Sequence, residues 1–243
     1  MISNFTHSES VIYSQIEQAA AIGQRCFAIL FDPEEVTEEA LIKQIEDLPD
    51  YTTHLFVGGS TATEAQTQLT VREIKKKTDL PVVLFPGDHN QITAEADALL
   101  FLSLISGENP EYLIRQQIKS VQKLKDSTLE IIPTGYILID GGVETAVQRV
   151  SKTEPLAQDD IEHIVAVALA GQYSGKKLLY LEAGSGAVNP VSVAVIKAVK
   201  QYISIPLIVG GGIRTREQLQ RAYEAGADLV VVGTAFENGN FRT

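Results

Sequence analysis

Short, wholly apolar runs recur along the chain, and each is followed by Gly, Asp or Ser and then by a polar segment with helical period. Such runs are typical of parallel strands that are buried on both faces. An amphipathic stretch at 11–22 precedes them, with Ser8 as its expected N-cap and Gly23 as its end, and predicts a leading helix. We expect strands at 27–31, 54–57, 82–85, 98–102, 136–139, 178–181, 207–209 and 229–232.

Eight such runs fit a closed (β/α)8 barrel, the TIM barrel, formed as a single domain by residues 1–243. An open, doubly wound sheet also alternates strands and helices and is the competing architecture. Two features favour the barrel. Glycines cluster after the sixth, seventh and eighth runs, where such barrels bind phosphate at the carboxyl face, and the first run leads into Asp32-Pro33 instead of a dinucleotide-binding Gly-x-Gly-x-x-Gly.

Two of the segments that follow predicted strands are too short for the full helix expected after each strand of a (β/α)8 barrel. Only about a dozen residues separate the third run from the fourth, with Pro86, Gly87 and Asn90 as helix breakers, so we expect a reduced third helix. Residues 235–242 leave room for only a short helix after the last strand.

Composition narrows the class of protein. The chain is 44% hydrophobic and 21% charged, and its net charge of −11 argues against a nucleic-acid surface. Cys26 is the only cysteine, which excludes a disulfide within the chain and suits a reducing compartment. The first residues lack a secretory pattern, and no apolar run is long enough to span a bilayer. We expect a cytoplasmic protein without a membrane span.

The run 178–186 carries the most chemical information. Tyr180 and Glu182 are two residues apart on a predicted strand, so their side chains share a face and can point into the barrel mouth. Gly184 and Gly186 allow backbone N–H groups to approach an anion, and Ser185 adds a hydroxyl. In the purely structural alternative, the glycines only make a turn and Glu182 pairs with a core arginine.

The next two strands also end in glycine. Gly211 and Gly212 precede Thr215, the expected cap of a helix whose first N–H groups would lie near an anion. Gly233 and Thr234 can offer N–H and hydroxyl donors from the last strand. Glycines after strands are common, but two such sites in register with 180–186 predict one phosphate site.

Oxygen ligands gather at the ends of the first two strands. Asp32 ends the first, and Ser60 follows the second within Gly-Gly-Ser-Thr. A sparse, oxygen-only set suits Mg2+, which keeps several waters and is completed by substrate phosphates, and it does not suit zinc. Asp32 can equally be a helix N-cap, with Pro33 opening the helix and Glu34 and Glu35 in its first turn.

Taken in order, these motifs resemble the geranylgeranylglyceryl phosphate synthase family, in particular the bacterial and larger archaeal branch of the superfamily that also includes heptaprenylglyceryl phosphate synthases. The resemblance spans nearly the whole chain, and its most specific part is Tyr-Leu-Glu-Ala-Gly-Ser-Gly at 180–186. The short third connection matches the family, whereas the short last helix does not. The other motifs are Phe-Asp-Pro at 31–33, Gly-Gly-Ser at 58–60, Phe-Pro-Gly at 85–87, Gly-Gly-Gly-Ile-Arg at 210–214 and Gly-Thr at 233–234.

The resemblance implies an enzyme that uses Mg2+ to transfer a prenyl group from a polyprenyl diphosphate to the 3-hydroxyl of sn-glycerol 1-phosphate, releasing diphosphate. It implies that Asp32 and Ser60 hold the metal, that Tyr180 and Glu182 are catalytic with Glu182 as the base, and that the protein is a homo-oligomer. The residues implied to bind glycerol 1-phosphate are Tyr180, Leu181, Glu182, Ala183, Gly184, Ser185, Gly186, Gly211, Gly212, Gly233 and Thr234.

Other side chains have both structural and functional interpretations. Phe101, Leu102, Leu104 and Ile105 form an apolar cluster that is either core or the trench that a prenyl tail requires. His89 lies on a top-face loop and can touch substrate. Competing functions are a synthase for longer, heptaprenyl chains, a phosphosugar isomerase, which would need a second acid–base group facing Glu182, and a non-catalytic phosphate-binding barrel.

Overall fold

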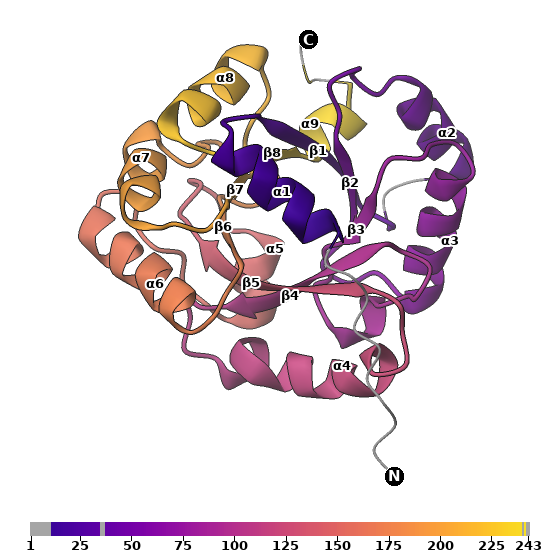
Figure 1. Ribbon diagram of the computed structural model, residues 1–243, viewed down its shortest axis with the longest axis horizontal. Helices are drawn as coiled ribbons and strands as arrows, with labels where there is room; N and C mark the ends of the chain where they lie inside the picture. Colours follow the sequence, from indigo (N-terminus) through magenta and orange to yellow (C-terminus); the bar gives the residue numbers. More distant parts are fainter. Residues whose placement is uncertain (1–10, 35–36, 240, 242–243) are drawn as a thin grey trace.

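The structure is a computed structural model that describes residues 11–34, 37–239 and 241. Eight parallel strands close into a barrel in sequence order, so the TIM-barrel prediction is confirmed and the open sheet is excluded (Figure 1). The strands are β1 (Cys26–Phe31), β2 (His54–Val57), β3 (Val82–Leu84), β4 (Ala98–Leu104), β5 (Glu130–Leu138), β6 (Leu178–Glu182), β7 (Leu207–Gly210) and β8 (Leu229–Val232).

Helices surround the barrel in Figure 1. Every strand except β3 is followed by at least one helix that connects it to the next strand or ends the chain. These helices are α2 (Glu38–Glu46) after β1, α3 (Glu64–Lys75) after β2, α4 (Gln116–Leu124) after β4, α6 (Ile161–Tyr173) after β5, α7 (Val193–Tyr202) after β6, α8 (Arg216–Ala225) after β7 and α9 (Thr234–Glu237) after β8. Between β3 and β4 there is only η1, a 3-10 turn at His89–Gln91, as the reduced third helix predicted. The last helix is short, again as expected. No helix in the described ranges is long and apolar enough to cross a bilayer.

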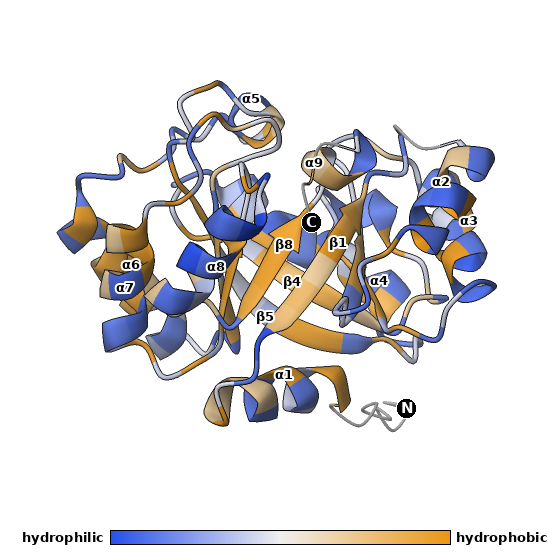
Figure 2. Cartoon of the chain, turned by 90° about the horizontal axis from the view of Figure 1, so that it is seen from above, coloured by the Kyte–Doolittle hydropathy of each residue, from blue (hydrophilic) through white to orange (hydrophobic). Residues whose placement is uncertain are grey.

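The leading helix α1 (Val11–Ala21) covers the amino-terminal end of the barrel, below the strands in Figure 2. Its buried side chains, among them Ile12 and Ile16, pack against the residues that fill the barrel interior. Gly23 has a left-handed φ of +71°, as predicted for the residue that ends the helix. The expected cap Ser8 lies outside the described residues.

Side chains along each strand alternate between two apolar layers. Phe27, Ile29 and Phe31 of β1 pack outward against the helices, whereas Ala28 and Leu30 face the interior. Because both faces are covered, most strand positions are apolar. This alternation decides which side chains of β6 can reach a ligand.

Two boundaries differ by more than two residues from the sequence expectation. β5 begins at Glu130, six residues before the predicted start, because 130–135 contain a charge, a proline and a glycine and do not read as a buried strand. Glu130 is nevertheless buried, because its carboxylate accepts the N–H groups of Ile12 and Tyr13 at 2.7 and 2.8 Å at the start of α1. The helix expected to open at Pro33 begins instead at Glu38, with Thr37 as its N-cap, so Asp32 is not a helix cap. Glu35 lies outside the described residues.

Candidate active site

A cavity of about 630 Å³ opens at the carboxyl end of the barrel, a volume typical of small-molecule sites. It is the place where a barrel of this topology brings the ends of its strands together. Most of the residues predicted for the site line it. They are Asp32, Ser60, Tyr180, Glu182, Gly184, Ser185, Gly186, Gly211, Gly212, Gly233 and Thr234.

Two predicted substrate contacts lie elsewhere. Leu181 and Ala183 are fully buried in the layer between the strands and the helices, on the opposite face of β6 from Tyr180 and Glu182. The Ala183 N–H is already used, since it donates to the Gly210 carbonyl at 3.1 Å. Strand alternation therefore keeps both side chains out of the cavity, although they lie within the motif.

Glu182 is the last residue of β6 and is 6% exposed. Its Oε1 atom accepts the Gly184 N–H at 2.6 Å, and no ion pair joins it to an arginine among the described residues. Burial of the carboxyl group raises the pKa of Glu182 to about 7. The Tyr180 hydroxyl and the Gly184 N–H have the opposite, smaller effect on this pKa. A carboxyl group with a pKa near 7 can take up or release a proton at physiological pH.

The glycine-rich loops form a cup beside Glu182. A side chain at Gly211 would place its Cβ atom 2.4 Å from Glu182 Oε1 and 2.6 Å from the Gly184 nitrogen, and φ at Gly211 is +83°. Only glycine therefore fits where the loops after β6 and β7 meet. The Ser185 and Thr234 hydroxyls lie 2.8 Å apart, which links the loop after β6 to the end of β8.

The predicted helix cap at the cup is confirmed. The Thr215 hydroxyl accepts the Gln218 N–H at 3.2 Å and caps α8, whose amino terminus borders the cavity. Oriented N–H groups and a helix amino terminus make a site suited to an anion.

Arg214 holds two of these loops together. Its guanidinium donates to the carbonyls of Ala187 at 2.5 Å, Gly212 at 3.2 Å and Gly186 at 3.5 Å. It is the one Lys or Arg among the described residues that line the cavity. The sequence motif contained Arg214, but only the fold shows that it bridges the loops after β6 and β7.

Asp32 and Ser60 contribute oxygen atoms to another part of the cavity wall. Asp32 Oδ1 accepts the Glu34 N–H at 3.0 Å, and the Asp32 N–H donates to Glu237 of α9. A Cβ atom at Gly59 would lie 2.4 Å from Asp32 Oδ1, so the glycine leaves room for the carboxylate. No cluster of three or more His, Cys, Asp or Glu occurs in the described part of the chain. The set fits a cation that keeps its waters and is completed by phosphate oxygens.

Part of the cavity lining is apolar and comes from β4. Phe101, Leu102 and Leu104 line the cavity, whereas Ile105 turns away and its Cδ1 atom lies beside Gly171 of α6. Residues of α4 and of the short helix α5 (Ala146–Ser151) complete the wall. His89 also lines the cavity, with its Nδ1 atom 2.9 Å from Gln116 Oε1.

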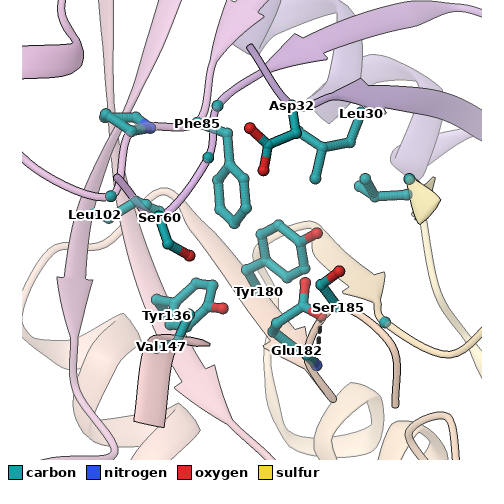
Figure 3. Close-up of a pocket in the computed structure, with 18 of the residues that line it drawn as sticks. Leu30, Asp32, Ser60, Phe85, Leu102, Tyr136, Val147, Tyr180, Glu182 and Ser185 are labelled. Atoms are coloured by element: carbon teal, nitrogen blue, oxygen red, sulfur yellow. Dashed lines mark hydrogen bonds between the residues drawn. The ribbon is translucent and has the colours of Figure 1, made fainter. Parts of the chain in front are cut away.

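Tyr136 is the main cavity residue that the sequence interpretation missed. It lies on β5 opposite Tyr180 of β6 in the strand register, and both rings face the interior. Figure 3 shows Tyr180 between the labelled Asp32 and Glu182, with Phe85 above it and Tyr136 to one side. The signal was present, since Tyr136 starts a predicted strand, but its partner strand was not known.

The family comparison decides among phosphate-binding barrels. The model of the PcrB family matches residues 20–242, which include every site residue described above. The chain belongs to the PcrB family.

Relatives within the PcrB family are similar over almost their full length. The geranylgeranylglyceryl phosphate synthase of Zunongwangia profunda is 60% identical over 231 residues, covering 95% of this chain and 99% of the relative. The synthase of Flavobacterium johnsoniae is 50% identical, with 94% and 95% covered.

Solved structures agree with this family assignment. The crystal structure of (S)-3-O-geranylgeranylglyceryl phosphate synthase from Thermoplasma acidophilum in complex with its substrate sn-glycerol-1-phosphate is 35% identical, with a TM-score of 0.86. The match covers 93% of this chain and 91% of that one. The tryptophan synthase α-subunit of Pyrococcus furiosus, at 13% identity and a TM-score of 0.56, shares only the fold.

Proposed function

We propose that this protein transfers a geranylgeranyl group from geranylgeranyl diphosphate to the 3-hydroxyl of sn-glycerol 1-phosphate. The observation that carries the proposal is the placement of Glu182, a buried carboxyl group that lies beside the glycine-rich cup in a cavity whose lining also includes apolar side chains of β4. Relatives up to 60% identical are geranylgeranylglyceryl phosphate synthases, which supports the same reaction here.

In this proposal the cup holds the phosphate of glycerol 1-phosphate. Backbone N–H groups of Gly186, Gly211 and Gly212, together with the Ser185 and Thr234 hydroxyls, supply the donors, whereas the Gly184 N–H remains bonded to Glu182. The bound phosphate fixes the glycerol so that its 3-hydroxyl points to Glu182, which converts an encounter between two molecules into a reaction between oriented groups.

The chemical step is a substitution at an allylic carbon. The C1–O bond of the prenyl diphosphate breaks and its electron pair leaves with diphosphate, while the glycerol 3-oxygen forms the new C–O bond. The proton of the 3-hydroxyl goes to the Glu182 carboxylate. Because the oxygen attacks a carbon with carbocation character, Glu182 accepts the proton late in the step.

Asp32 and Ser60 would hold Mg2+ at the diphosphate end of the cavity. The ion supplies neutralisation of the charge that develops on the leaving diphosphate. Asp32 is oriented for this role by its contact with the Glu34 N–H and by the space at Gly59.

The apolar side chains of Phe101, Leu102 and Leu104 in the cavity lining would contact the prenyl tail. The longer-chain synthase, the phosphosugar isomerase and the non-catalytic barrel are not favoured. The relatives at 60% and 50% identity are geranylgeranylglyceryl phosphate synthases, which favours prenyl transfer over isomerisation or binding alone.

We further propose that the protein works in the cytoplasm as a homo-oligomer. Buried, unpaired Cys26 suits a reducing compartment, and the exposed apolar side chains of Ile114 and Ile118 suit a protein contact. Light scattering on the purified protein would measure the mass, and a monomer at micromolar concentration would contradict the oligomer.

The function is tested by incubating the protein with Mg2+, sn-glycerol 1-phosphate and radiolabelled geranylgeranyl diphosphate. We expect a labelled ether product with the 1-phosphate and none with the 3-phosphate enantiomer. Glycerol phosphate binding without product from C20 donors would contradict the proposal. Product only from longer donors would instead identify a longer-chain synthase.

A further inference from the structure

Three aromatic rings meet inside the barrel at the floor of the cavity. The ring of Phe85, just beyond β3, stacks on Tyr180 of β6 with centroids 5.1 Å apart and an interplanar angle of 25°. Tyr136 of β5 lies 5.9 Å from Phe85 and 5.5 Å from Tyr180. Because β3 is not a neighbour of β6 in the barrel, Phe85 and Tyr180 meet across its interior.

The rings are placed where the two substrates would meet. Figure 3 shows the Asp32 carboxylate and the Glu182 carboxylate on opposite sides of Phe85 and Tyr180. In the proposed function the diphosphate lies at Asp32 and the glycerol hydroxyl at Glu182. The allylic carbon that changes partners must therefore pass between them, next to the ring cluster.

The surroundings of the rings suit positive charge. Both tyrosine rings are deeply buried, and the one Lys or Arg of the described cavity lining, Arg214, belongs to the phosphate cup. Both tyrosines interact electrostatically with Glu182, which carries negative charge when it acts as a base. Phe85 is half-buried and lines the cavity, so one part of its ring is accessible to a ligand.

We propose that Phe85 is a catalytic residue whose ring face stabilises the positive charge that develops on C1 of the prenyl donor, and that Tyr136 and Tyr180, which pack against this ring, are positioning residues that hold it there. The inference rests on the proposed prenyl transfer. As the C1–O bond breaks, the electron pair leaves with diphosphate and C1 becomes electron-poor. The ring quadrupole attracts a cation, and the attraction ends when the glycerol oxygen bonds to C1.

The decisive test reduces the electron density of the Phe85 ring face while keeping the shape of the side chain. Mono-, di- and trifluorophenylalanine placed at position 85 weaken the negative ring face stepwise with little change in volume. We expect the single-turnover rate to fall stepwise, reaching about a tenfold loss with the trifluoro ring, because cation–π attraction is worth about 1 to 2 kcal/mol. Binding of glycerol 1-phosphate, followed by calorimetry, should stay unchanged.

Conventional variants separate the ring from other roles. Phe85→Leu keeps an apolar side chain and is expected to lower kcat about tenfold or more, with little effect on the KM of glycerol 1-phosphate, whereas Phe85→Tyr should keep most activity. Tyr136→Phe keeps the ring and should stay within a few-fold of wild type, whereas Tyr136→Leu should lose activity as Phe85→Leu does.

Specific results would overturn the inference. A flat response to fluorination in an active enzyme would show that the Phe85 face does not interact with developing charge. Equal losses for Tyr136→Phe and Tyr136→Leu would assign the effect at that position to the hydroxyl. An inactive wild type would instead contradict the proposed prenyl transfer, so the two failures are distinguishable. Thermal unfolding of each variant identifies losses that come from misfolding, and the fluorinated series remains informative in that case.

Discussion

The Glu182 carboxylate accepts the N–H of Gly184, two residues later in the chain, at 2.6 Å. The contact turns one carboxylate oxygen toward the glycine-rich loop and orients the acid at the edge of the phosphate cup. Orientation of the base and shape of the cup are therefore set by the same short segment, and Gly211 packs against both.

Replacing the carboxylate should remove the base but keep the cup. We expect Glu182→Gln to lower kcat by about 10²- to 10⁴-fold, the usual contribution of a general base, while binding of glycerol 1-phosphate changes little because the amide oxygen can still accept the Gly184 N–H. Steady-state kinetics and calorimetry measure the two quantities. A variant that keeps wild-type kcat would exclude Glu182 as the base.

The pH dependence follows from the raised pKa of Glu182, about 7. The base must be ionised, so kcat/KM should fall about tenfold per pH unit below 7 and level off above it. The contribution of Glu182 to the free energy of unfolding changes with pH in the opposite direction from kcat/KM. The folded protein keeps a proton between pH 4.5 and 7 that the unfolded chain has released, so this contribution is complete below 4.5 and is lost as the pH rises through 7. Urea unfolding should therefore show Glu182→Gln gaining stability over wild type from pH 5 to pH 8.

Asp32 provides the test of the metal proposal. Asp32→Asn should raise the Mg2+ concentration needed for half-maximal rate by at least tenfold and lower kcat, because an amide is a weaker ligand than a carboxylate. Asp50→Asn, at an exposed position away from the cavity, is the matched control. A titration of rate against Mg2+ that is identical in wild type and Asp32→Asn would argue against this ligand.

Arg214 should act on phosphate binding and not on the chemical step. Its three carbonyl contacts hold the loops after β6 and β7 together, so Arg214→Met is expected to raise the KM of glycerol 1-phosphate about tenfold or more. The kcat at saturation and the KM of the prenyl diphosphate should change much less. Arg221→Met removes a surface arginine paired with Glu217 and is the control. A fall in kcat alone would show that Arg214 has a different role.

Glu130 should affect stability without affecting catalysis. Its buried carboxylate accepts the Ile12 and Tyr13 N–H groups at the opposite end of the barrel from the cavity. Glu130→Ala would leave these donors without a partner and should lower the free energy of unfolding by about 1–3 kcal/mol. Urea unfolding of this variant beside Glu46→Ala, an exposed site, measures the difference, and kcat should be unchanged at temperatures where both variants are folded.

The sequence by itself determined the architecture and most of the site. Buried parallel strands are apolar on both faces, so their positions could be predicted from apolar runs. Glycines at the strand ends indicated which loops could bind an anion. The motif around Glu182 indicated the family, and the match of the PcrB family model to residues 20–242 confirmed it. The start of β5 at Glu130 was not predicted, because a carboxylate at the start of a buried strand needs hydrogen-bond donors. Those donors are the N–H groups of Ile12 and Tyr13 in α1, which lie far away in the sequence.

Only the tertiary structure decided which side chains meet. Strand alternation turned Leu181 and Ala183 away from the cavity although they lie within the motif. The shear of the barrel brought Tyr136 beside Tyr180, and closure of the barrel brought Phe85 onto Tyr180 from across the interior. The pKa of Glu182 depends on burial by distant strands. These properties come from contacts between segments far apart in the chain, which no local pattern of residues specifies.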